Sequence, residues 1–153
     1  MTETTVDRIT RIVEIEAPVA RVWRALTDHR EFGTWFRARI DAPFAVGETS
    51  RGRMTYPGWE HAAWEAKVVA IEPERRFAFL WPHTEDYGPS KEGDPFTLVE
   101  FTLEPTARGT RLTVTESGLE VLPEARRSTV LRDNTEGWEM QTENIRAHVA
   151  ANP

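Results

Sequence analysis

Hydrophobic and polar residues alternate along most of the chain, and a period of two is typical of half-buried β-strands. In the first such segment, 8–16, Ile9, Val13 and Ile15 share one face and polar residues occupy most of the other. Further alternating segments, separated by turn-forming residues, are found at 49–56, 60–71, 76–81, 97–103 and 110–117. A short strand is also expected at 38–41. Because short turns join consecutive strands, the pattern predicts an antiparallel meander of six to seven strands.

Two short helices are expected between the first strand and the meander. Pro18 suits the first turn of a helix, and apolar residues recur at helical spacing from there to Leu26. Asp28 is suited to cap a second helix, which carries Phe32 and Phe36. The sequence therefore predicts a bent pair of helices at this point.

The segment 123–151 lacks strand alternation and predicts one long helix. Trp138, Ile145 and Val149 fall near one face of it, and a helix of this length reaches about 40 Å, enough to cross a sheet. The elements together predict an α+β fold for a single domain, residues 1–153, in which a curved antiparallel sheet wraps a long C-terminal helix.

The composition is that of a globular chain with an excess of aromatic residues. A chain of 153 residues can bury one core, and 39% hydrophobic with 29% charged residues argues against disorder. The six Trp, seven Phe and two Tyr supply more rigid contact surface than a small core needs. Either the core itself is aromatic or aromatic residues line a cavity.

Charge and cysteine content exclude several classes of partner and site. The formal net charge is -6 without a basic stripe, so nucleic acid is not an expected partner. The absence of cysteine excludes disulfides and thiolate chemistry. The polar N-terminus lacks a signal sequence, and no apolar run approaches the roughly 20 residues that span a bilayer. We therefore expect a cytoplasmic protein that does not insert into membranes.

A set of short motifs occurs in a particular order along nearly the whole chain. These are Ala17-Pro18, Val22-Trp23, Leu26-Thr27, Trp35-Phe36, Ile71-Glu72-Pro73, Phe79, Trp81, Gly109-Thr110-Arg111-Leu112-Thr113, Ser117-Gly118-Leu119 and Gly137-Trp138. The ordered set resembles the helix-grip superfamily of START lipid-transfer domains, birch pollen allergen and polyketide cyclases. Within it, the set is most similar to the branch homologous to the activator of the heat-shock-protein ATPase. The chain departs from that branch in having Thr142 where a leucine is usual, and in a long acidic loop at 82–95.

The resemblance implies a cavity between the sheet and the long helix that holds a small hydrophobic or aromatic molecule. Strand parity indicates which side chains face it. The expected ligand-binding residues are Trp35, Phe36, Met54, Tyr56, Trp64, Phe79, Trp81, Val99, Phe101, Trp138, Thr142 and Ile145. The alternative is that the same residues fill a solid core.

Two charged residues, Arg11 and Glu116, fall on strand faces that are otherwise apolar. In the helix-grip order their strands are neighbours, so the two could form a partly buried ion pair, since a lone buried charge would be very costly. Alternatively, either strand end reaches solvent.

No constellation of residues marks a metal site or a nucleophile with its base, and no cofactor is expected. Acid or base catalysis by one positioned residue is a minority interpretation, with Glu116, His83 and Tyr87 as candidates. The loop 82–95 is either a lid over the cavity or a mobile surface excursion.

The sequence is compatible with three functions. The leading hypothesis is a carrier or sensor that binds a small hydrophobic or aromatic molecule without transforming it. The second is an enzyme of the cyclase, aromatase or hydrolase type that uses the same cavity. The third, a co-chaperone-like module with a chaperone partner, is suggested by the family name alone: the eukaryotic activator joins this domain to a separate N-terminal one, whereas this chain begins directly at the first strand.

Overall fold

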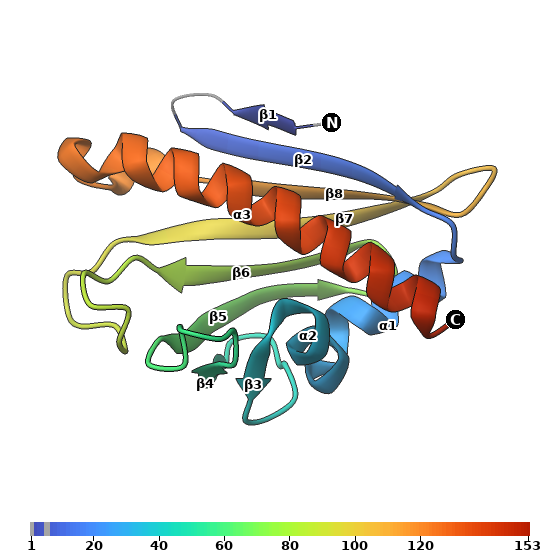
Figure 1. The fold of residues 1–153 in the computed structure, drawn as a ribbon, viewed down its shortest axis with the longest axis horizontal. Coiled ribbons are helices and arrows are strands. Elements are labelled where there is room, and N and C mark those ends of the chain that lie inside the picture. The colour runs from blue at the N-terminus through green and yellow to red at the C-terminus, as the bar shows by residue number, and fades with distance from the viewer. Residues whose placement is uncertain (1, 5–6) are drawn as a thin grey trace.

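The computed structural model, which describes residues 2–4 and 7–153, contains one antiparallel sheet with helices on one face (Figure 1). The described strands follow the order β1-β2-β8-β7-β6-β5-β4-β3 across the sheet. Their bounds are β1 Thr2–Thr4, β2 Arg8–Ile15, β3 Ala38–Ile40, β4 Thr49–Met54, β5 Ala63–Glu72, β6 Arg76–Pro82, β7 Phe96–Pro105 and β8 Thr110–Ser117. The α+β class and the antiparallel meander are confirmed.

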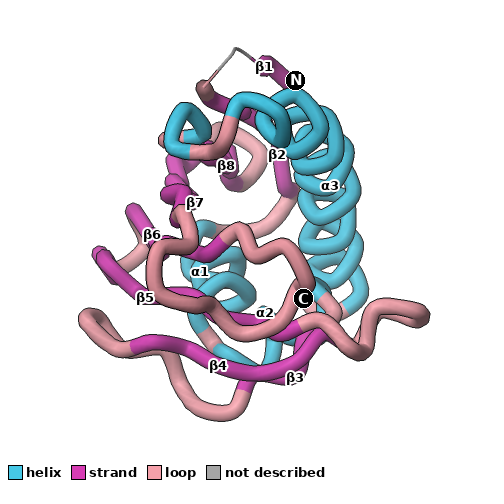
Figure 2. Tube along the Cα trace, turned by 90° about the vertical axis from the view of Figure 1, so that its left-hand side faces the viewer, coloured by secondary structure: helices cyan, strands magenta, loops and turns pink. Residues whose placement is uncertain are grey.

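Helices cover the inner face of this sheet. They are α1 Val19–Thr27, α2 His29–Phe36, the short 3-10 helix η1 Leu119–Val121 and the long α3 Glu124–Ala151. Figure 2 shows α3 running along one side of the sheet, and α1 and α2 lie near its C-terminal end (Figure 1). The predicted pair of short helices and the long C-terminal helix are confirmed.

The described residues form eight strands, where the sequence predicts six to seven. The missed strand, β1, has no apolar alternation and is held by pairing with β2, with Thr2 opposite Arg11. The turn between β4 and β5 is also longer than predicted. It contains Gly58 at a φ of 91°, and the Trp59 N–H donates to the Tyr56 carbonyl oxygen at 2.9 Å, so pairing stops before these residues.

The short helices are fixed locally as the sequence indicates. The Asp28 side chain accepts hydrogen bonds from the Arg30 and Glu31 backbone N–H groups at 2.9 and 3.1 Å, which caps α2. Arg37 then adopts a left-handed conformation, with φ of 65°, and ends the helix.

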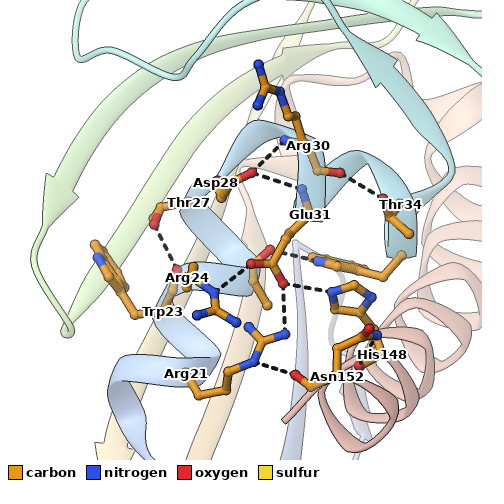
Figure 3. A network of polar contacts seen from close by, with 12 residues as sticks. Arg21, Trp23, Arg24, Thr27, Asp28, Arg30, Glu31, Thr34, His148 and Asn152 are labelled. Atoms are coloured by element: carbon orange, nitrogen blue, oxygen red, sulfur yellow. Dashed lines mark hydrogen bonds and ion pairs between the residues drawn. The ribbon is translucent and has the colours of Figure 1, made fainter.

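A polar network around Glu31 joins α1, α2 and α3 (Figure 3). The Glu31 carboxylate accepts bonds from Arg21 Nη2 at 2.8 Å and Arg24 Nε at 2.7 Å on α1. His148 Nε2 on α3 lies 2.8 Å from it, and Arg21 Nε donates to the Asn152 carbonyl oxygen at 2.7 Å. The network fixes the C-terminal end of α3 against α1 and α2.

The Glu31 network should make stability depend on pH in acid. Burial raises the pKa of Glu31, but hydrogen bonds from His148, Arg24 and Arg21 outweigh burial and lower it from 4.5 to about 2. The carboxylate therefore stabilises the fold fully above about pH 4.5, and the contribution is lost as the pH falls towards about 2. Because Glu31 is partly exposed to screening solvent, we expect Glu31→Gln to cost about 1 to 2 kcal/mol at neutral pH and little near pH 2. Urea denaturation across this range tests it, with the exposed Glu48→Gln as control; an equal loss at both pH values would contradict it.

Aromatic rings fill most of the space between the sheet and the helices. Phe32 of α2 lies at the centre, fully buried, with ring centroids of neighbours 4.7 to 6.4 Å away. Those neighbours are Trp35, Phe36, Phe44, Trp64, Phe77, Phe79 and Phe101. Much of the aromatic excess thus belongs to the core.

Candidate functional site

The candidate site is built around Glu116, a carboxylate on the apolar face of β8. Leu112, Val114 and Glu116 alternate with partly exposed residues, so strand parity turns all three inward. Glu116 stands opposite Ile9 of β2 and Val99 of β7, and its exposed fraction is 0%. A carboxylate at such a depth requires hydrogen-bond partners.

Five side chains from three elements and the adjoining loop surround the two Glu116 oxygens. Oε1 accepts bonds from Asn134 Nδ2 and Trp138 Nε1 of α3, at 2.9 and 3.0 Å. Oε2 accepts bonds from Thr97 Oγ1 at 2.7 Å and Trp81 Nε1 at 2.9 Å, and His83 Nε2 lies 3.4 Å away. The carboxylate thereby ties β6, β7 and α3 together.

These partners keep the carboxylate charged in spite of its depth. Burial raises the pKa of Glu116, but hydrogen bonds from His83, Thr97, Trp81 and Trp138 outweigh burial, so the pKa lies below its usual value of 4.5. At neutral pH the Glu116 carboxylate is therefore ionised. In the described part of the chain, the ion-pair partner of Glu116 is His83, rather than an arginine or lysine.

The hydrogens between His83, Thr97 and Glu116 follow from counting donors. His83 Nε2 lies 2.7 Å from Thr97 Oγ1, and the same hydroxyl donates to Glu116. A threonine hydroxyl has one hydrogen to donate. With Glu116 ionised, Thr97 therefore accepts from His83, and the imidazole carries a hydrogen on Nε2.

A small hollow lies beside this cluster, between α3 and the aromatic core. Its volume is about 110 Å³, and it is lined by Phe36, Trp81, Asn134, Gly137, Trp138, Met140 and Gln141. Three of these residues, Trp81, Asn134 and Trp138, are among the four that donate to Glu116. The carboxylate thus stands behind the walls of the hollow and holds them in place.

Comparisons with known proteins agree with this fold. Residues 16–150 match the model of the family described as Activator of Hsp90 ATPase homolog 1-like protein. The chain belongs to this family. The match confirms the resemblance to the helix-grip superfamily and to its activator-like branch. No curated protein matches the sequence.

Solved structures of similar fold include several bacterial proteins. Protein MLL2253 from Mesorhizobium loti is 23% identical with a TM-score of 0.76, over 95% of this chain and 98% of that one. A protein from Arthrobacter aurescens is 22% identical with a TM-score of 0.84, over 99% and 91%. DynU16, from the dynemicin biosynthetic locus, is 25% identical with a TM-score of 0.74. That match covers 94% of this chain and 47% of DynU16, so the chain spans about half its length.

The predicted ligand-binding residues divide into three groups in this activator-like domain. Phe36, Trp81 and Trp138 line the hollow. A second group is buried in or against the core: Trp35, Trp64, Phe79, Val99, Phe101, Thr142 and Ile145, with Met54 partly buried beside them. Tyr56 lies beyond the end of β4, is 36% exposed, and has the Arg37 guanidinium over its ring. Contact of any of these residues with a ligand stays a prediction.

Four residues of the hollow were not predicted from the sequence: Asn134, Gly137, Met140 and Gln141. Helical spacing could have found two of them. Asn134 and Gln141 lie four residues before and three residues after Trp138, on the same face of α3.

The predicted ion pair between Arg11 and Glu116 is wrong. Arg11 stands opposite Val114, and Ile9 is the residue opposite Glu116. The Arg11 guanidinium instead donates to Thr142 Oγ1 at 3.1 Å and to Glu143 Oε1 at 3.4 Å, both on α3. The carboxylate is satisfied by neutral donors and a histidine in place of the arginine.

The catalytic candidates are only partly brought together. Glu116 and His83 meet, but Tyr87 is 54% exposed and its ring contacts Trp59, with centroids 5.2 Å apart. The loop that carries Tyr87 is bound to β5, because Ser90 donates both its N–H and its hydroxyl to Glu65. A lid role for this loop stays a prediction.

The described residues hold no cluster of three or more potential metal ligands. None of the helices formed by these residues has the length and apolar character needed to cross a membrane.

Proposed function

We propose that this domain binds a small, mostly apolar molecule, about the size of one aromatic ring, in the hollow beside α3 and does not transform it. The family fold is one that suggests ligand binding or a cyclase-like role. The observation that carries the proposal is Gly137, in the middle of α3 and on the lining of the hollow.

Neither the backbone conformation nor the packing requires a glycine at position 137. It is helical, and a Cβ added there would meet no atom within 4 Å. Glycine inside a helix costs about 1 kcal/mol relative to alanine. Asn134, Gly137, Trp138 and Gln141 share one helix face, so a side chain at 137 would project towards the hollow. The absence of a side chain keeps that space open.

The size of the hollow limits the ligand. Drug-sized ligands occupy pockets of about 300 to 1,000 Å³. An apolar cavity of about 150 Å³ accepts benzene. At about 110 Å³, with the half-exposed Met140 on its lining, the hollow suits a single ring or a branched alkyl group.

The arrangement of Glu116 favours binding over catalysis. Four donors occupy its two oxygens, His83 lies 3.4 Å from one of them, and the carboxylate does not line the hollow. A general acid or base must lie within hydrogen-bond reach of the group it serves. Glu116 instead orients the two indoles and the Asn134 side chain, which line the hollow. A chaperone partner stays a prediction, which a pull-down with the purified chain would test.

Filling the hollow should abolish binding without harming the fold. We expect Gly137→Leu to weaken the binding of phenol, indole or benzyl alcohol at least about tenfold and to leave the melting temperature unchanged or raised. The matched control is Glu136→Leu, which adds the same side chain at the neighbouring exposed position of α3. Isothermal titration calorimetry measures both. Equal affinity of Gly137→Leu and wild type would refute this site, and failure of the wild type to bind any of the three compounds would refute the proposal.

A further inference from the structure

The walls of the hollow are mostly aromatic. Trp81 and Trp138 are stacked, with ring centroids 5.4 Å apart and planes 22° from parallel. Phe36 is tilted against both, with centroids 6.3 and 6.4 Å away. Aromatic rings at the wall of a site bind cations through the ring quadrupole, as in the aromatic cages that bind quaternary ammonium groups.

A buried negative charge adds to this quadrupole. Both indoles direct their N–H edges at the Glu116 carboxylate. An anion at the edge of an indole pushes electron density towards the ring faces, which strengthens their attraction for a cation.

No arginine or lysine in the described part of the chain forms an ion pair with the carboxylate, whose partner there is His83. The lining of the hollow contains no basic residue among those described. The net charge of -6 further favours the approach of a cation.

From these contacts we infer that the hollow selects a small organic cation, a quaternary ammonium or alkylated amine group, over a neutral group of the same shape. The inference rests on the proposed function, because it assigns a ligand class to the same hollow. The cation would lie against Phe36, Trp81 and Trp138, with Glu116 behind the two indoles.

The direct test compares two ligands that differ only in charge. Choline and its uncharged isostere, in which a quaternary carbon replaces the nitrogen, are titrated into the wild-type chain and followed by calorimetry. We expect choline to bind about tenfold more tightly. Equal binding of the two would overturn the inference and leave the proposed function standing. If neither choline nor its isostere binds, and the neutral single-ring compounds do not bind either, the inference and the proposed function are both overturned.

A pair of variants separates the local charge from the general field of the protein. In Glu116→Gln, the ratio of the affinities for choline and for its uncharged isostere should fall to about one, because the substitution removes the charge and nearly keeps the shape of the side chain. Glu65→Gln removes a different buried carboxylate, one bound by Ser90 and outside the hollow, and should keep the preference. Loss of the preference in both variants, or in neither, would overturn the role of Glu116. The comparison of ligands in the wild type requires no variant and holds even if Glu116→Gln fails to fold.

Discussion

Replacing Glu116 by leucine is expected to lower the free energy of unfolding by about 4 kcal/mol. Leucine has a similar volume, so the loss would come from the donors of Trp81, Thr97, Asn134 and Trp138, which would be buried without an acceptor. Urea denaturation monitored by circular dichroism measures the change.

The control for this experiment is the same substitution at an exposed strand position. Glu104 lies near the end of β7 and is exposed, so Glu104→Leu should change stability by less than about 0.5 kcal/mol. If Glu116→Leu stays within about 1 kcal/mol of the wild type, Glu116 does not organise the walls of the hollow.

Replacing Phe32 by alanine is expected to cost about 3 to 5 kcal/mol. Phe32 is fully buried and lies among seven other aromatic rings, so its removal would leave a cavity that packed rings cannot readily fill. Thermal and urea unfolding should both show the loss.

An exposed aromatic residue provides the comparison. Trp59 is 44% exposed and packs against His61 and Tyr87 at the surface. Although its side chain is larger, Trp59→Ala should cost under about 1 kcal/mol. Similar losses for the two variants would mean that the ring cluster around Phe32 is not the centre of the core.

The alternating pattern predicted the strands from β2 onward and the direction of the Glu116 side chain, and helical spacing predicted the helices. Parity along β8 places Glu116 on the same face as Leu112 and Val114, and this face is the buried one. Strand parity does not specify which residues of other elements donate hydrogen bonds to Glu116. The donors Trp81 and Trp138 lie 35 and 22 residues away in the sequence, on elements whose positions depend on sheet register and helix packing.

The error over Arg11 has the same origin. Both Arg11 and Glu116 were correctly assigned to neighbouring strands, but the register of β2 against β8 brings Ile9, two residues earlier, opposite the carboxylate. A shift of two residues preserves the face and changes the partner, so the hydrophobic pattern cannot detect it.

The high number of aromatic residues could not show whether these residues line a cavity or fill a solid core. A ring packed against other rings and a ring that lines a hollow occupy the same apolar positions in the pattern. In the structure, Phe79 and Phe101 belong to the packed cluster, whereas Trp81, two residues after Phe79 on the same strand face, reaches the hollow. The difference lies in where α3 crosses the sheet, which the sequence pattern does not give.

The hollow beside α3 is tested most directly by the indole N–H signals in nuclear magnetic resonance spectra of protein with isotope-labelled tryptophan. During titration with a single-ring compound, we expect the signals of Trp81 and Trp138 to shift together with one affinity. The signals of Trp35, which donates to the Ala25 carbonyl oxygen in the core, and of the surface residue Trp59 should stay in place. Saturable shifts at Trp59 with none at Trp81 or Trp138 would place binding elsewhere and contradict the account.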